Sequence, residues 1–310
     1  MIFTVTLNTA IDHIIEVEGT LTRKANNKTK NVIYDIGGKA IHVSVALSYM
    51  NIPNKATGVV GGSNGKLMVD LAEKKGVECH FVEQENCETR ESIIVVDETG
   101  LGSYMITQRG FVLSELSIQK IKDFLANNVA KDDIVVFSGT PPQGFKLEDY
   151  HDLMQIVKDR EARIIADTTK DYLATALKFR PTLVKPNEFE FQEFLGKELH
   201  TQDDYIQALR EMDDLAEFWV VSLGKKGSIA KKGDEIIVVT PPTIKEVNET
   251  GAGDFFVSGL VAKIHENAPL EEVLRYGTAV GASKAKQREV SHFDVEDALK
   301  LMNECKIERV

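Results

Sequence analysis

The chain has 310 residues, 43% hydrophobic and 27% charged, a balance that excludes an intrinsically disordered protein. Its formal net charge of -11 argues against nucleic acid or an anionic membrane surface as the main partner, because both require a basic face. No run of about 18 apolar residues and no signal-peptide pattern occurs, so we expect a cytoplasmic protein that does not enter a membrane.

Strands and helices alternate along most of the chain. Short β-branched runs predict buried strands at 2–8, 56–61, 133–139, 163–167, 182–186 and 218–224. Helical spacing follows at 39–51 and 65–76. The alternation predicts one α/β domain over residues 1–310, with a mainly parallel sheet covered by helices on both faces. Ligands of such folds gather at the carboxyl ends of the strands.

Two stretches, residues 10–36 and 88–109, break this rhythm. Within the second, the segment ESIIVVDETGLGSYMI predicts a hairpin that turns around Glu98, Thr99 and Gly100. We expect these stretches to form a small β flap, a lid over the site. Because an exposed strand edge tends to pair with another chain, we also expect a homodimer through this lid.

Two glycine-rich segments resemble nucleotide-binding loops without meeting their patterns. GGSNGK at 61–66 lacks the phosphate-loop residues, since Val60 and Leu67 stand where Gly and Ser or Thr are needed, and it predicts a strand-to-helix turn. GAGDFF at 251–256 fails the dinucleotide fingerprint because Phe256 replaces the third glycine. A nicotinamide-dependent enzyme is therefore disfavoured.

The second of these segments is better explained as the start of a helix. Gly251, Ala252 and Gly253 leave backbone N–H groups open at the positive end of the helix, which suits a phosphoryl group. Asp254 is then placed to accept a proton from an attacking hydroxyl, an arrangement that suits phosphoryl transfer. The alternative is an aspartate that only stabilises its own helix, by about 0.3–1 kcal/mol.

Further motifs show a resemblance to a known family. NETGAGD at 248–254 resembles the second signature of the PfkB-type carbohydrate kinases, and residues 37–62 resemble the first. Other matching segments follow in family order: TLNTAID at 6–12, ETR at 88–90, SGTPPQG at 138–144, LVKPNEFE at 183–190 and VVSLGKKG at 220–227. The resemblance implies a three-layer α/β/α ribokinase-like fold and an ATP- and Mg²⁺-dependent kinase, with Asp254 as general base and Gly251 to Gly253 as anion hole.

The resemblance also implies residues that bind the acceptor. Asp12, Gly37 and Gly38 match sugar contacts, while Lys39, Arg90 and Lys28 supply cations in an acidic protein. A lysine directly after the glycine pair is similar to the branch of 1-phosphofructokinases and tagatose-6-phosphate kinases, so we expect a ketohexose phosphate as acceptor.

The chain departs from the family pattern at three positions. His42 stands where an asparagine ordinarily touches the sugar, Ala40 replaces a glycine, and Glu249 adds negative charge beside the expected phosphate site. These departures put the identity of the acceptor in question and leave the expected fold unchanged.

The nucleotide side of the site is implied in the same way. Lys185, Ser222, Gly224 and Gly227 match positions that line the ATP cleft. Asn187 and Glu190, three apart at a helix start, match the pair that organises Mg²⁺ through water. Without the family pattern, the same residues would be interpreted as a helix cap, a surface acid and a turn between strands.

Two alternatives remain open from the sequence. One is a kinase of an unphosphorylated sugar or nucleoside, against which Lys39 and Arg90 argue. The other is a degenerate relative that binds sugar phosphate or nucleotide as a sensor, which His42, Ala40 and Glu249 motivate.

Overall fold

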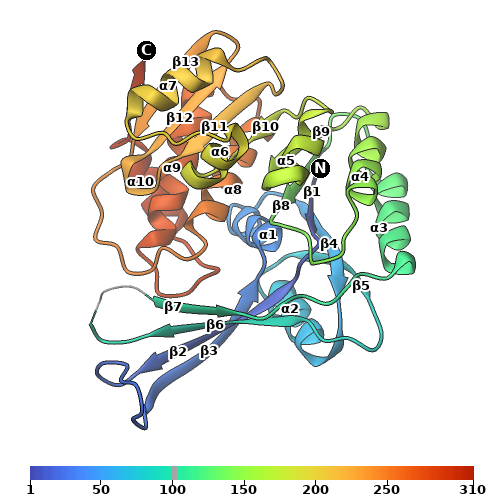
Figure 1. Ribbon diagram of the computed structural model, residues 1–310, viewed down its shortest axis with the longest axis vertical. Coiled ribbons are helices and arrows are strands. Elements are labelled where there is room, and N and C mark those ends of the chain that lie inside the picture. The colour runs from blue at the N-terminus through green and yellow to red at the C-terminus, as the bar shows by residue number, and fades with distance from the viewer. Residues whose placement is uncertain (100–102) are drawn as a thin grey trace.

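The computed structural model describes residues 1–99 and 103–310, and a large ten-stranded sheet forms its centre (Figure 1). In spatial order the strands are β14 (Lys306–Arg309), β13 (Glu235–Thr240), β12 (Ser228–Lys232), β11 (Phe218–Ser222), β10 (Leu183–Val184), β9 (Arg163–Asp167), β8 (Ile134–Ser138), β1 (Ile2–Thr6), β4 (Asn54–Val60) and β5 (Glu78–Glu83). Neighbours from β11 to β5 are parallel, and β12 to β14 are antiparallel additions at one edge.

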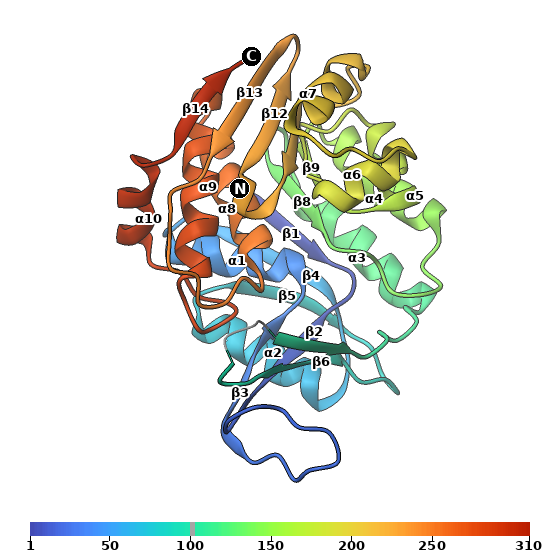
Figure 2. The ribbon, with the colours of Figure 1, turned by 60° about the vertical axis from the view of Figure 1, so that its left-hand side comes forward.

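Helices cover both faces of this sheet, as Figures 1 and 2 show. One face carries α1 (Lys39–Tyr49), α2 (Gly62–Lys74), α8 (Ala252–His265), α9 (Leu270–Ala285) and α10 (Val295–Met302). The other carries α3 (Glu115–Asn128), α4 (Leu147–Asp159), α5 (Lys170–Leu177), α6 (Glu188–Leu195) and α7 (Gln202–Glu211). The predicted three-layer α/β/α fold is confirmed. Within residues 1–99 and 103–310, none of the helices has the length and apolar character needed to cross a membrane.

Side chains of the central strands alternate between two cores. In β8, Ile134 and Val136 pack in the core beside α1, α8 and α9, whereas Val135 and Phe137 pack in the core beside α3 and α4. Successive strand residues point to opposite faces, so a strand buried on both sides is apolar throughout. This explains why the β-branched runs identified these strands correctly.

The helix expected at 65–76 begins earlier, at Gly62. The backbone N–H of Asn64 donates to Glu88 Oε1 at 2.6 Å, so a carboxylate from a distant segment satisfies the first turn. An acid at a helix N-terminus is favourable because it meets unpaired N–H groups and the positive end of the helix dipole. The GGSNGK segment is therefore mainly the first turn of α2.

A second sheet of four strands lies beside the main body. Its order is β3 (Thr29–Gly37), β2 (Ala10–Val17), β6 (Arg90–Val96) and β7 (Ser103–Thr107), and only β2 and β6 run parallel within it. All four strands come from the two stretches expected to form a flap. Strands β6 and β7 pair antiparallel, as the predicted hairpin requires. Of the predicted turn residues, Gly100 lies outside the described residues. The action of this sheet as a lid stays a prediction.

Helices α8 and α9 lie side by side and approach each other at glycines (Figure 2). A Cβ atom at Gly259 would lie 2.7 Å from the Cα of Gly277, closer than a real Cβ contact permits. A Cβ at Gly281 would lie 3.1 Å from the carbonyl oxygen of Ala252, at the start of α8. This close packing fixes the N-terminal turn of α8 against the C-terminal half of α9.

The contact predicts that Gly259→Ala lowers the free energy of unfolding by about 1–3 kcal/mol, because the added methyl group forces the helices apart. Gly253→Ala, in the same helix, adds a methyl where no atom lies within 4 Å. It should raise the free energy of unfolding by up to about 1 kcal/mol through helix propensity. Urea denaturation measures both variants, and equal values for the two would contradict this account of the packing.

Candidate active site

A pocket of about 210 Å³ opens where several strands of the main sheet end. Its wall includes the carboxyl ends of β1 and β8, the start of α1 and the start of β6. The lining residues are Val5, Thr6, Leu7, Asn8, Gly38, Lys39, Arg90, Phe137, Ser138, Gly139, Thr140 and Tyr150. The pocket lies at the carboxyl edge of the parallel strands, where ligands of such folds were expected.

Asp254 lies in the first turn of α8, which begins after Gly251 in the left-handed conformation (φ 81°). Its side chain is 11% exposed, and His42 Nδ1 donates to its Oδ2 over 2.7 Å. The other ring nitrogen of His42, Nε2, donates to the carbonyl oxygen of Ile36 at 2.8 Å. Because a carbonyl and a carboxylate only accept, both ring nitrogens carry protons and His42 is an imidazolium.

The electrostatics of this pair agree with the geometry. Burial by itself would lower the pKa of His42, but the hydrogen bond and charge of Asp254 raise it to about 9. Since both ring nitrogens are used inside the protein, His42 has no free N–H for a sugar. Its predicted sugar contact stays untested, and what the structure shows is a contact with Asp254.

The backbone at the start of α8 is partly open. The N–H of Ala252 donates to the carbonyl oxygen of Glu249 at 3.0 Å. The N–H groups of Gly251 and Gly253 have no acceptor within the part of the chain that the structure describes. Two of the three amides expected in the anion hole are therefore available to an anion.

Asp12 enters the same site from β2 and is 6% exposed. Burial raises the pKa of its carboxyl to about 7 against the opposing charge of His42, and the charges of Asp35 and Asp254 add to the rise. A Cβ at Gly37 would lie 2.5 Å from Asp12 Oδ1, so only glycine leaves room for this carboxylate.

Gly38 follows as the N-cap of α1, with a φ of 115° that favours glycine. A Cβ at this position would lie 2.9 Å from the Cγ2 methyl of Thr6, so the backbone turn also lacks room for a side chain. The predicted glycine pair is thus required by the local fold as well as by any sugar contact.

Arg90 is the cation best placed for a negatively charged ligand. Its Nε donates to Asn8 Oδ1 at 2.9 Å, and no carboxylate of the described residues lies within ion-pair distance of it. Lys39, by contrast, lies 3.9 Å from Asp167 Oδ2 and 3.6 Å from Glu190 Oε1, and these acids raise the pKa of its ammonium.

Lys28 is the predicted cation that the structure does not bring to this cluster. It is exposed near the far end of the β2–β3 hairpin, seven residues from Asp35, which pairs with Asp12. Seven residues of strand span about 23 Å.

Sequence analysis missed Asp167, a buried acid within ion-pair distance of both Lys185 and Lys39. It is 1% exposed, Lys185 Nζ lies 3.1 Å from its Oδ1, and Ser138 Oγ donates to its Oδ2 at 2.7 Å. Burial alone would raise the pKa of Asp167, but the charges of Lys185 and Lys39 hold it below its ordinary value. The signal was present, since Asp167 ends a strand at the carboxyl edge of the predicted sheet.

The remaining predicted nucleotide residues gather nearby. Asn187 caps α6 and forms a capping box with Glu190, whose Oε2 accepts from the Asn187 N–H at 2.8 Å. Asn187 also bridges to Ser222 at the end of β11. Gly224 has open space around it, whereas a Cβ at Gly227 would collide with the carbonyl oxygen of Val239. Both the capping and the turn interpretation of these residues are therefore correct structurally.

The donor atoms here suit a metal held through water. Among residues 1–99 and 103–310, no three His, Cys, Asp or Glu side chains are grouped to hold an ion directly. Glu190 is 13% exposed, and its Oε1 is not bound to the helix cap. Mg²⁺ retains several waters and needs only one or two carboxylates together with phosphate oxygens, so the residues present fit it.

The sequence profile of a known family, described as "pfkB family carbohydrate kinase", matches residues 5–297. The chain belongs to this family. The predicted recognition and the predicted activity class, an ATP-dependent carbohydrate kinase, are confirmed.

Similar proteins carry related names. The 1-phosphofructokinase of Bacillus subtilis (strain 168) is 29% identical over 315 residues, covering 100% of both chains. The ATP-dependent 6-phosphofructokinase isozyme 2 of Escherichia coli (strain K12) is 30% identical over 270 residues, covering 85% of this chain and 87% of its own. The D-tagatose-1-phosphate kinase of Bacillus licheniformis is 28% identical and covers 92% of each.

Solved structures agree with the fold. Phosphofructokinase-2 from Escherichia coli in complex with fructose-6-phosphate gives a TM-score of 0.90 at 28% identity, covering 97% of this chain and 98% of that chain. A possible 1-phosphofructokinase from Thermotoga maritima gives 0.87 at 28% identity, covering 100% and 99%.

The raised pKa of Asp12 predicts a pH-dependent cost to stability. Its pKa is 3.8 in a free side chain and about 7 in the fold, so between pH 4 and 7 the folded state binds the extra proton. Stability is therefore lost as pH rises through this window. Asp12→Asn should raise the free energy of unfolding at pH 8 by up to about 4 kcal/mol, with no gain below pH 4.

Urea denaturation at several pH values measures this effect. Asp70→Asn, at an exposed acid of α2, serves as the control and should show no pH-dependent gain. A gain for Asp12→Asn that is the same at pH 4 and pH 8 would be incompatible with the raised pKa.

Proposed function

We propose that the enzyme transfers the γ-phosphoryl group of ATP to a hydroxyl of a ketohexose phosphate. The observation that carries this proposal is the buried carboxylate of Asp254 beside the open N–H groups of Gly251 and Gly253. A base and an anion hole on the same helical turn suit transfer of a phosphoryl group to a hydroxyl.

A phosphorylated ketohexose is supported by two further points. Arg90 lies at the pocket without a carboxylate partner among the described residues, so its charge is available to a substrate phosphate. The similar proteins named above all carry the names of kinases of phosphorylated ketohexoses. Asp12, Gly37 and Gly38 would contact the sugar. Lys39 would add positive charge between the sugar side and the nucleotide side of the site. Lys28 would act only as a distant cation.

Asp254 accepts the proton of the acceptor hydroxyl as that oxygen attacks the phosphoryl group. The N–H groups of Gly251 and Gly253 stabilise negative charge on the transferred group, and Ala252 keeps the turn in place through its bond to Glu249. His42 fixes one oxygen of Asp254, which leaves Oδ1 to face the hydroxyl.

ATP is proposed to bind along the ends of β10 and β11. Lys185, Ser222, Gly224 and Gly227 line this stretch, and Asn187 and Glu190 would hold Mg²⁺ through water. When bound, Mg²⁺ neutralises charge on the phosphate oxygens. The chain's own contribution is to hold Lys185 and Lys39 around Asp167, which keeps cations beside the phosphates.

Asp254→Asn should lower kcat by about 10²–10⁴, because the amide cannot accept the hydroxyl proton. A coupled assay of ADP release measures the rate with fructose 1-phosphate, fructose 6-phosphate, tagatose 1-phosphate, tagatose 6-phosphate, fructose, ribose and adenosine. Asp70→Asn, an exposed acid outside the site, is the control and should keep the rate of the unmodified enzyme.

The outcomes of this assay distinguish the proposed function from its two alternatives. Turnover of one phosphorylated ketose names the acceptor, and turnover of fructose, ribose or adenosine alone favours the kinase of an unphosphorylated acceptor. Binding without turnover across the panel favours a sensor. Full activity of Asp254→Asn would reject Asp254 as the base.

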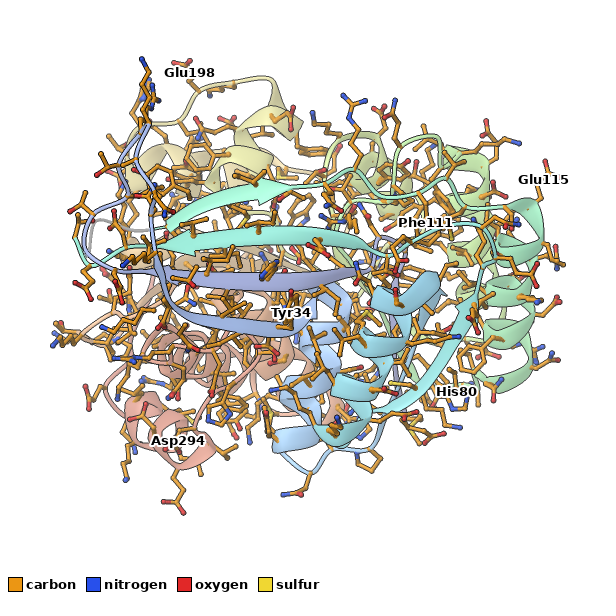
Figure 3. All side chains as sticks on the ribbon, turned by 90° about the horizontal axis from the view of Figure 1, so that it is seen from below. Tyr34, His80, Phe111, Glu115, Glu198 and Asp294 are labelled. Carbon is orange, nitrogen blue, oxygen red and sulfur yellow. The ribbon has the colours of Figure 1, made fainter. Side chains whose placement is uncertain are left out.

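We also propose that the second sheet acts as a lid and joins two copies of the chain. Its strand register places two apolar rows on the face turned away from Asp12, a face seen from below with Tyr34 labelled in Figure 3. The rows are Tyr34, His13, Ile93 and Ile106, and Val32, Ile15, Val95 and Tyr104. An exposed apolar face of this kind marks an interface, here a face rather than the strand edge expected from the sequence.

Ile106→Glu should convert the dimer to a monomer at micromolar concentration, because it places a charge in the apolar face. Met105→Glu is the matched control, since Met105 is 55% and Ile106 59% exposed on the same strand while facing opposite sides. Sedimentation measures the mass. A monomeric unmodified protein, or dissociation by both variants alike, would reject this interface.

A further inference from the structure

Lys284, on α9, is a lysine with no exposed surface. Its Nζ donates to the carbonyl oxygen of Asn248 at 3.0 Å, and this is its one hydrogen bond within the described part of the chain. No carboxylate of the described residues lies within ion-pair distance of Nζ. A buried ammonium with a single hydrogen bond is costly to the folded state, so its presence calls for a reason other than stability.

The partner of Lys284 is the residue that shapes the proposed anion hole. Asn248 Oδ1 accepts from the N–H of Thr250 at 3.0 Å, and Asn248 Nδ2 donates to the carbonyl oxygen of Arg288 at 2.9 Å. The N–H groups of Val247 and Asn248 both donate to the carbonyl oxygen of Ala285. Asn248 thus connects the end of α9 to the residue directly before Gly251, and Lys284 satisfies its remaining carbonyl.

The charges around Lys284 come from several elements. Asp254 on α8, Asp35 on β3 and Glu289 after α9 are the acids that act on it. The same acids are shared with other cations, since His42 on α1 bonds Asp254 and Lys75 lies 3.8 Å from Asp35. Burial lowers the pKa of Lys284 to about 8, against the opposing influence of the acids.

We propose that Lys284 is a positioning residue for phosphoryl transfer: its buried ammonium holds the turn from Asn248 to Gly251 and adds a fixed positive charge behind the anion hole. This inference rests on the proposed function, in which Gly251 and Gly253 bind the transferring group. Negative charge on that group is stabilised more strongly by a fixed cation in a dry interior than by one in water.

Two substitutions separate the charge of Lys284 from its hydrogen bond. Lys284→Met removes both in a side chain of similar length, and Lys284→Gln keeps a donor without the charge. Both should lower kcat about 10–100-fold, by analogy with the loss of a residue that orients a metal ligand. The apparent melting temperature of Lys284→Met should be unchanged or higher, because a buried unpaired charge has been removed.

The pH profile gives a readout that a purely structural lysine would not alter. The kcat of the unmodified enzyme should fall as pH rises above about 8, where the ammonium loses its proton, and this decline should be absent in Lys284→Met. Added methylammonium should restore part of the lost rate in Lys284→Met, with tetramethylammonium as the control for ionic strength. Lys286→Met, at the neighbouring lysine that pairs with Asp297, should retain the rate and the profile of the unmodified enzyme.

A binding measurement keeps this proposal separate from the identity of the acceptor and from the role of Asp254. Calorimetry with ATP and with ADP, in the absence of sugar, compares ligands that differ in the γ-phosphoryl group. The preference for ATP over ADP should fall about tenfold in Lys284→Met. An unchanged preference together with unchanged kcat in Lys284→Met, or full activity of Lys284→Gln, would overturn the proposal, whichever sugar is phosphorylated.

Discussion

The ion pair between His42 and Asp254 joins α1 to α8, and the other features of the site are arranged around it. It fixes one oxygen of the carboxylate beside Gly251 and Gly253 and places positive charge between Asp254 and Asp12. Without this imidazolium, two buried acids would face each other with less compensation, which is unfavourable in a low-dielectric interior. The close glycine packing of α8 on α9 keeps the helix turn in position for this contact.

A protein with a net charge of -11 that handles phosphates must concentrate its cations. The structure does so with side chains of different kinds at one edge of the sheet. Arg90 is open to a ligand, and Lys39 and Lys185 share Asp167. His42 is buried beside Asp254, and Lys284 is buried against the carbonyl oxygen of Asn248. Burying these charged side chains lowers the stability of the fold, and destabilising groups of this kind are expected at binding sites.

The fold could be predicted from the sequence because its signals are local. Runs such as IVVFS at 134–138 are apolar on both faces, and only a doubly covered parallel strand explains that pattern. The helix start at 251–254 could also be predicted from its glycines and its acid, since a helix start needs no distant partner. The contacts between residues of the site were harder to predict from the sequence. His42 and Asp254 are 212 residues apart, and no spacing rule connects them.

The same limit applies to the residues that sequence analysis missed and to the predicted one that lies apart from the pocket. Asp167 became important only when the sheet order brought β9 beside β8 and β10. Lys284 has a helical position like many others, and its burial depends on how α9 packs. Lys28 looked like a site cation, yet the length of the β2–β3 hairpin carries it away from the pocket.

Alternate residues of strand β2 contribute to opposite faces of the second sheet. Asp12 faces His42, and its neighbour His13 stacks with Tyr34 on the opposite face, with ring centroids 4.4 Å apart. Because side chains alternate strictly, one inserted or deleted residue in β2 would exchange the two sets and disable both faces together. The connecting loop at 18–28 carries no such constraint, so length variation during evolution is tolerated there and forbidden within the strand.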